Sequence, residues 1–218
     1  LNDNKEMEGH YVDGHKNGLW TWWFDSGVKQ SEGHYIEDDQ DGLWSYFSKD
    51  GSIAEEVTFS GGKRDGRSTI WLTPEEKQEE KFYKNGKLDG PSTFWENGYR
   101  ITMTTYKSDS PEGPWVIWYS NNDQIKEQGF HQRGIREGLT TYYYEDGTMQ
   151  REGFFRQGLP DGLWTYWNKK AEKDFEFDFG TGLQHISLED LVERESIFYK
   201  LGENIPFTGI ITQENPEA

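Results

Sequence analysis

The triplet Asp178-Phe179-Gly180 is the segment that most resembles catalytic machinery, because it spells the metal-binding triplet of protein kinases. Kinase chemistry also needs a glycine-rich loop over the phosphates and a His-Arg-Asp loop that supplies the base, and the sequence has neither. Gly62-Lys63 and Gly86-Lys87 are not phosphate-binding loops, since no Ser or Thr follows the lysine and the upstream glycine is missing. We therefore interpret the triplet as the end of a strand along which Phe175, Phe177 and Phe179 alternate.

Other residues that could support catalysis or bind metal lack the necessary partners. The sequence has no Gly-x-Ser-x-Gly or His-Glu-x-x-His motif and no cysteine. His10 and His34 occupy equivalent places 24 residues apart, but no third ligand recurs with them, so they predict surface or packing residues rather than a metal site. The acidic runs at 37–41, 75–80 and 189–195 do not follow the spacing of an EF-hand. We expect no enzyme activity, no metal and no cofactor.

Composition narrows the class of partner. The chain has 218 residues and a formal net charge of −17, and it is 32% hydrophobic yet 16% aromatic. Such a charge repels nucleic acid and anionic lipid headgroups, so we expect a protein partner with a basic surface, which the acidic runs could dock. The sequence has no run of 18 apolar residues, so it predicts no membrane-spanning helix. Because the chain starts at Leu1, we expect that an N-terminal piece has been removed.

An internal repeat organises most of the chain. A glycine preceded by Asn, Asp or Glu recurs at spacings of 24, 24, 24, 23, 25 and 24 residues. These repeat glycines are Gly18, Gly42, Gly66, Gly90, Gly113, Gly138 and Gly162. Four residues before each of them lies a Gly or Asp, types that tolerate positive φ as a tight turn demands. A second turn, such as Ser26-Gly27 or Asp146-Gly147, follows in each unit.

Aromatic residues repeat in the same register. Positions two and four after the repeat glycine point to one face of a strand, and position five points to the other. We expect the position-five aromatics, from Trp23 to Trp167, to pack between adjacent hairpins; the alternative is an exposed ladder that stacks sugars or a partner's apolar side chains. A binding groove, if present, is predicted along positions two and four, at Trp20, Trp22, Trp44, Tyr46, Trp115, Tyr142, Trp164 and Tyr166.

These patterns predict an all-β fold, an extended, twisted single antiparallel sheet of tandem hairpins of about 24 residues each. Seven units would give roughly 14 strands over about 65 Å. We predict an array over residues 1–180 and a C-terminal cap over 181–218. In the cap, Ser187 to Glu195 reads as a short helix with Ser187 as its N-cap, and the strands around it read as a truncated repeat.

The repeated segments Asp41-Gly42-Leu43-Trp44-Ser45-Tyr46 and Asp161-Gly162-Leu163-Trp164-Thr165-Tyr166 resemble the MORN repeat, in particular its bacterial variant class. The segment Pro206-Phe207-Thr208-Gly209 is similar to a phrase common in that class. The resemblance covers about residues 9–179, and Arg67-Ser68 and Pro91-Ser92 depart from it by replacing Leu-Trp. The resemblance implies a bacterial protein of the cytoplasm or the cell envelope, and the sequence does not choose between these compartments.

The resemblance also suggests functions. Many bacterial members are similar to antitoxin or immunity partners of secreted toxins, and eukaryotic arrays act as scaffolds linked to membranes. Some MORN proteins bear a phosphatidylinositol-phosphate kinase label because a separate catalytic domain is attached. We therefore expect a non-catalytic scaffold for protein–protein interaction, of antitoxin or immunity type. The alternatives are a self-associating or membrane-associated scaffold and, least favoured, a lipid kinase.

Overall fold

The chain forms two compact units, residues 1–135 and residues 136–218. The computed structural model describes the backbone of residues 5–180, 185–187, 191–194, 197–200 and 210–212, and the side chains of residues 5–180. The described residues contain strands but no helix, and hence no helix that could span a membrane. The predicted boundary between array and cap near residue 180 stays a prediction.

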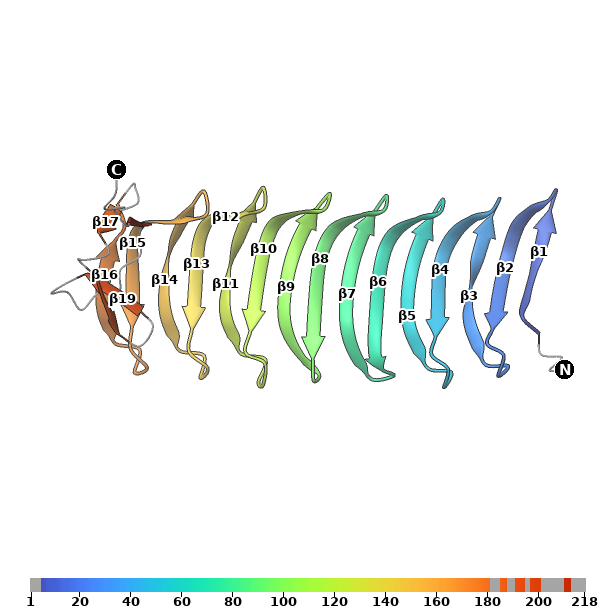
Figure 1. Cartoon of the computed structure of the whole chain (residues 1–218), viewed down its shortest axis with the longest axis horizontal. Coiled ribbons are helices and arrows are strands. Elements are labelled where there is room, and N and C mark those ends of the chain that lie inside the picture. Colours follow the sequence, from blue (N-terminus) through green and yellow to red (C-terminus); the bar gives the residue numbers. More distant parts are fainter. Residues whose placement is uncertain (1–4, 181–184, 188–190, 195–196, 201–209, 213–218) are drawn as a thin grey trace, which may run out of the picture. The chain divides into compact units, whose positions relative to one another are not determined.

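In the first unit, each strand pairs antiparallel with the strands next to it in sequence, so one open sheet is built in chain order (Figure 1). Its strands are β1 (Met7–Val12), β2 (His15–Trp23), β3 (Lys29–Ile36), β4 (Asp39–Phe47), β5 (Ile53–Ser60), β6 (Lys63–Thr73), β7 (Glu76–Lys84), β8 (Lys87–Glu96), β9 (Tyr99–Lys107), β10 (Ser110–Trp118) and β11 (Ile125–Gln132). A two-residue strand, β12 (Ile135–Arg136), lies at the division between the units.

The second unit contains β13 (Gly138–Tyr143), β14 (Met149–Arg156), β15 (Leu159–Trp167) and β16 (Lys173–Asp178), followed by the short strands β17 (His185–Ser187), β18 (Leu191–Arg194), β19 (Ile197–Lys200) and β20 (Ile210–Thr212). In this unit, β13 to β16 pair antiparallel in chain order, β18 pairs antiparallel with β19, and β17 pairs parallel with β20. The prediction of an all-β, antiparallel array of tandem hairpins is therefore confirmed.

Tight turns of one type recur along one end of the strands. Both central residues of each turn have positive φ, as at Asp13 (51°) and Gly14 (87°), which is the type I′ geometry whose twist matches paired strands. The turns are centred on residues 13–14, 37–38, 61–62, 85–86, 108–109, 133–134 and 157–158. The sequence prediction of positive φ four residues before each repeat glycine is thus confirmed.

Hydrogen bonds join each of these turns to the next. The Gly62 N–H donates to the Gln40 carbonyl at 2.9 Å, and in the second unit the Gly158 N–H donates to the Arg136 carbonyl at 3.0 Å. The acidic residue before a repeat glycine adds a second link, since the Glu137 carboxylate accepts from the Gln157 N–H at 2.8 Å. The recurring acid-glycine pair therefore couples neighbouring hairpins through its side chain.

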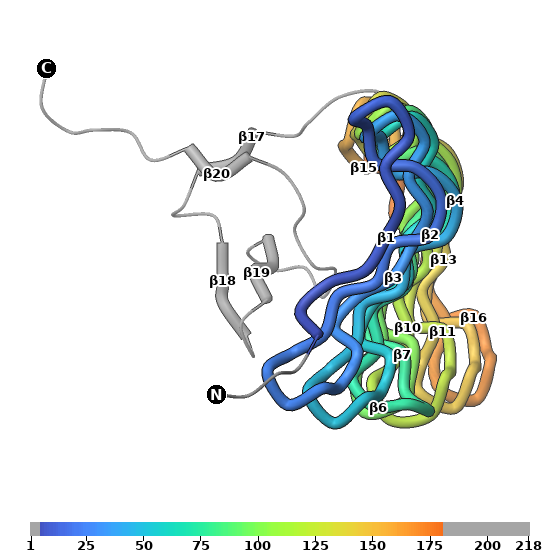
Figure 2. The backbone as a smooth tube through the Cα atoms, turned by 90° about the vertical axis from the view of Figure 1, so that its right-hand side faces the viewer, coloured from blue at the N-terminus to red at the C-terminus, as the bar shows by residue number. Residues whose placement is uncertain are grey.

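The repeat glycines themselves lie inside strands, at β-bulges. In the pairing of β3 with β4, Glu32 faces Ser45 and His34 faces Asp41, so Gly33 alone lies opposite residues 42–44. Gly42 takes φ +69°, a conformation that costs other residues more. A bulge bends the strand that carries it. Figure 2 shows the bent path of the hairpins in the first unit.

The bulge turns a tryptophan back over a glycine of the preceding strand. A Cβ built on Gly33 would lie 2.2 Å from Cδ2 of Trp44, so the indole occupies the place of the missing side chain. The Trp44 Nε1–H donates to the His34 carbonyl at 3.1 Å. Trp44 is only 2% exposed, although the described residues of the first unit form one sheet with no second layer. Trp20 over Gly9 and Trp164 over Gly153 repeat this interlock.

The hairpin of β5 and β6 lacks this tryptophan and has a larger residue on the preceding strand. Ser68 stands at the tryptophan position and faces Val57, whereas Gly9 and Gly33 stand at the place of Val57 in the first two interlocks. Ser68 is 4% exposed and Val57 is 1% exposed. A valine–serine pair is smaller than a glycine–tryptophan pair, so it fills the same space only in part. Both side chains are nevertheless buried.

The helix predicted for Ser187 to Glu195 is wrong for the residues of that segment that the structure describes. Ser187 ends β17, and Leu191–Arg194 form β18, which pairs antiparallel with Ile197–Lys200. Residues 188–190 and 195 lie outside the described residues, as does the Pro206–Gly209 phrase. A helix this short is marginal alone, whereas the β-favouring Ile-Phe-Tyr of β19 offers the backbone of β18 hydrogen-bond partners.

The interlock predicts that Gly33→Ala destabilises the fold by about 1–3 kcal/mol, because the new methyl group must displace the Trp44 indole. Chemical denaturation followed by circular dichroism measures this loss. The matched background is Trp44→Ser, in which the methyl group meets no ring. There the same alanine should cost close to nothing, which gives a coupling of about 1 kcal/mol or more. Equal costs in the two backgrounds would contradict the interlock.

Candidate functional site

Four of the eight residues predicted to form an aromatic groove lie together in the first two hairpins. The ring centroids of Trp20 and Trp22 are 5.7 Å apart, those of Trp22 and Trp44 are 5.6 Å apart, and those of Trp44 and Tyr46 are 6.2 Å apart. Positions two and four of adjacent hairpins thus form a continuous stack along one face of the sheet.

A lysine closes part of this stack. The Lys16 ammonium lies 4.8, 5.4 and 5.0 Å from the ring centroids of Trp20, Trp22 and Tyr35. This is an intramolecular aromatic cage for a cation. Burial raises the pKa of the Tyr35 hydroxyl above its ordinary value, as expected for a ring packed between two hairpins. The stack is therefore a packed cluster with a cationic cover.

The second unit holds three more of the predicted residues. The Tyr142 and Trp164 ring centroids are 6.1 Å apart, and Tyr166 stacks on Phe175 at 4.3 Å. The Arg151 guanidinium lies 4.0 Å from the centroid of Tyr142, so a cation covers this cluster as well. Burial raises the pKa of Tyr166. The eighth residue, Trp115 on β10, faces Thr104 on the preceding strand β9, and its ring centroid lies 5.5 Å from that of His131.

Burial separates the eight residues into two groups. Trp20, Trp44, Trp115 and Trp164 are 2–3% exposed, so a ligand could reach their ring faces only if the sheet rearranged. Trp22, Tyr46, Tyr142 and Tyr166 keep part of their surface accessible. Ligand binding by this face stays a prediction, and its accessible part is the position-four residues.

The position-five aromatics on the other face are half-buried, apart from the buried Trp118. Lys5 lies 5.2 Å from the Trp23 ring centroid, Lys29 lies 5.5 Å from that of Phe47, and Arg100 lies 4.7 Å from that of Trp118. These cations shield the rings without removing them wholly from solvent. The array thus uses cation–π contacts on both faces.

The sequence analysis missed an exposed apolar feature, the leucine that follows the repeat glycine. We name Leu19, Leu43, Leu139 and Leu163 the bulge leucines; they are 48, 53, 46 and 53% exposed. Each follows a positive-φ glycine and precedes position two of the repeat, so the bulge that buries an indole turns the leucine outward. The recurring Gly-Leu-Trp triplet could have predicted this exposure, because a leucine next to a buried tryptophan in a strand points to the opposite face.

The Asp178-Phe179-Gly180 triplet ends a strand segment, and the two histidines in equivalent repeat positions lie on different strands. Phe179 is buried against Trp164, and the Gly180 N–H donates to the Asp178 carboxylate at 2.8 Å, so the triplet ends the β16 segment. His10 lies on β1 and His34 on β3, with β2 between them. Within the described part of the chain, no three His, Asp or Glu residues gather as a metal site.

A comparison with protein families now identifies the hairpins. A family model described as the MORN repeat variant matches residues 16–37, 40–60 and 136–157. Each match covers a pair of adjacent strands, β2–β3, β4–β5 or β13–β14. Three segments of the chain thus match the MORN repeat variant. Such repeats are in general modules for protein or membrane interaction and are generally non-enzymatic. A search of curated proteins finds no match.

One charged pair on the turns gives a pH dependence. His15 Nδ1 and Asp38 Oδ2 are 2.6 Å apart, and this bond raises the pKa of His15 above its ordinary 6.5. The Lys16 backbone N–H and His15 together lower the pKa of Asp38 below its ordinary 3.8. A raised histidine pKa stabilises the fold at low pH and loses this effect as pH rises through the folded value. A lowered aspartate pKa stabilises at high pH and loses its effect as pH falls.

The pair therefore contributes most between the two ordinary pKa values. His15→Gln should lower the melting temperature at about pH 5 and have little effect at about pH 9, where the histidine is neutral in folded and unfolded chains alike. Thermal unfolding at both pH values measures this, with Asp38→Asn as the matched variant, which keeps an oxygen for the Lys16 N–H. An equal change for His15→Gln at both pH values would count against this account.

Proposed function

We propose that the array is a non-catalytic scaffold that binds a protein partner with a basic surface. Two properties support this. The net charge of −17 favours a basic partner and would speed its association. The MORN-variant repeats place the chain among interaction modules. The observation that carries the proposal is the set of outward-facing apolar residues on the bulges, because such residues are found where another protein covers them.

The second unit shows this feature most clearly. Leu139 on β13 faces Phe154 on β14, and both side chains are on the solvent side, 46 and 55% exposed. Leu163, from the next bulge in this unit, is 53% exposed. Acidic side chains border them, since Phe154 faces Asp161 and Leu163 faces Asp178. An apolar patch with an acidic rim suits a partner that brings apolar groups surrounded by lysine or arginine.

The specific form that we favour is an immunity-type role, in which the basic partner is a toxin that the array neutralises. The resemblance of Asp41–Tyr46 and Asp161–Tyr166 to antitoxin-like MORN repeats and the acidic surface support it. An anionic membrane is a less suitable target, because a net charge of −17 opposes the approach to it.

Affinity capture with matched variants tests the proposal. The Leu139→Ser/Phe154→Ser double variant should lose the protein that the wild type retains, because both changes remove apolar contact from the patch. Leu72→Ser is the control, since Leu72 is 61% exposed on β6, in a different hairpin, and is not one of the bulge leucines. The retained protein should be basic and should elute as salt rises. Equal retention by both variants, or retention insensitive to salt, would contradict the proposal.

Self-association is the second candidate, and the edge strand β1 favours it. Within the first unit β1 pairs only with β2, so its other side presents backbone groups to which a further strand could add. In the capture experiment, recovery of the bait with other copies of itself, and of no basic protein, would favour this candidate.

A further inference from the structure

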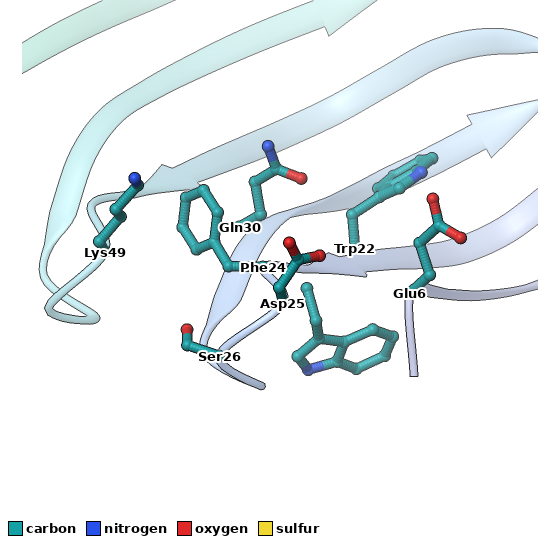
Figure 3. Close-up of a pocket in the computed structure, with 8 residues that line it drawn as sticks. Glu6, Trp22, Phe24, Asp25, Ser26, Gln30 and Lys49 are labelled. Carbon is teal, nitrogen blue, oxygen red and sulfur yellow. The ribbon is translucent and has the colours of Figure 1, made fainter. Parts of the chain in front are cut away.

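A hollow of about 390 Å³ lies at the end of the first hairpin, where β2 turns into β3. The residues that line it include the aromatic Trp22, Trp23 and Phe24 and the acidic Glu6 and Asp25. Figure 3 shows the side chains around it. Backbone hydrogen bonds hold the main chain at both acidic residues. The Glu6 carbonyl accepts from the Trp23 N–H at 3.0 Å, and Asp25 sits in a turn closed by the bond from the Phe24 N–H to the Val28 carbonyl at 2.8 Å.

The second hairpin has the same backbone pattern and different side chains at the equivalent places, so it serves as an internal comparison. Its turn is closed by the Ser48 N–H on the Ser52 carbonyl at 2.8 Å, as the first turn is closed by Phe24. Twenty-four residues after Phe24 and Asp25 stand Ser48 and Lys49, and Gln30 stands 24 residues after Glu6. Of these two hairpins, only the first therefore has an aromatic ring at the place of Phe24 and acids at the places of Glu6 and Asp25.

The rings beside the hollow already accept cations from the chain itself. Lys5 lies 5.2 Å from the Trp23 centroid, and Lys16 lies 5.4 Å from that of Trp22. An indole face with a carboxylate beside it is the combination that binds a guanidinium group, which stacks on the ring and donates to the acid at the same time. Lys49 is the one basic residue in the lining, and Figure 3 places it at the opposite end from Glu6.

We propose that this hollow binds an arginine side chain of the partner protein, with the guanidinium against the Trp23 ring and its N–H groups directed to Glu6 and Asp25. The inference rests on the proposed function, since it names how the basic surface of the partner would be recognised. Arginine suits the site better than lysine because its planar group can stack and donate together, whereas an ammonium is a compact and more strongly hydrated charge.

Nuclear magnetic resonance of the full-length chain tests the site directly. The probes are the blocked amino acids N-acetyl-arginine methylamide and N-acetyl-citrulline methylamide, which differ in charge but hardly in shape. The arginine probe should shift the indole N–H signals of Trp22 and Trp23 in a saturable way, with a dissociation constant on the order of millimolar. The citrulline probe should not. Equal shifts with citrulline, or no saturable shift with arginine, would overturn the proposal.

Variants separate this site from general charge effects. Glu6→Gln/Asp25→Asn should weaken arginine binding at least ~10-fold, because both acceptors lose their charge. Lys49→Gln should strengthen it by ~2–5-fold, because a competing cation is removed. Glu75→Gln removes one negative charge from an exposed turn residue in a different hairpin and should change nothing. If Glu75→Gln weakened binding as much as the double variant, the hollow would not be the site.

The capture experiment keeps the two proposals distinguishable. If the wild-type chain retains a basic protein and Glu6→Gln/Asp25→Asn retains it equally, the hollow is not where the partner binds, although the scaffold function stands. If no basic protein is retained while the arginine probe still binds at Trp22 and Trp23, the scaffold function fails, and with it the assignment of the hollow to a partner.

Discussion

The packing of a tryptophan over a glycine of the preceding strand is the interaction on which this fold depends most. A single-layer sheet cannot bury its residues against a second layer, so burial has to come from within the sheet. The indole of Trp44 achieves this by lying in the space that a side chain on Gly33 would fill, and its N–H bonds to the backbone of the same strand. Because each interlock joins adjacent strands, stability accumulates by neighbours, as in other repeat arrays.

The same geometry connects the fold to the proposed function. A bulge at a positive-φ glycine is needed to turn the indole inward, and it leaves the preceding leucine outside. An array that buries its tryptophans in this way therefore displays apolar residues at regular positions. The hollow beside Trp22 and Trp23 shows that the surface can also differ between hairpins. Turn residues can change while the interlocks and the hydrogen bonds between turns are kept.

Much of the fold could be predicted because its constraints are local. Positive φ at the second central residue of each type I′ turn followed directly from the Gly and Asp types four residues before each repeat glycine, whereas positive φ at the first central residue was not predicted. The face of the strand on which Trp20 and Trp44 lie also followed from alternation, but their burial did not, because it depends on Gly9 and Gly33 in another strand. Those glycines recur 24 residues apart, so the signal was present. Leu191–Arg194 suggested a helix because a short apolar spacing fits both structures, and only the pairing with β19 decides between them.

Hydrogen exchange of the tryptophan indoles tests the central claim most directly. Trp20, Trp44 and Trp164 lie over a glycine of the preceding strand and donate their Nε1–H to backbone carbonyls at 3.2, 3.1 and 3.1 Å. Their indole protons should exchange only when neighbouring hairpins separate, and hence far more slowly than that of the half-exposed Trp22. Protection of these three signals, each lost when the glycine beneath is replaced by alanine, would support the interlock as the basis of the fold. Exchange of all four indoles at similar rates would show that the array is held together in another way.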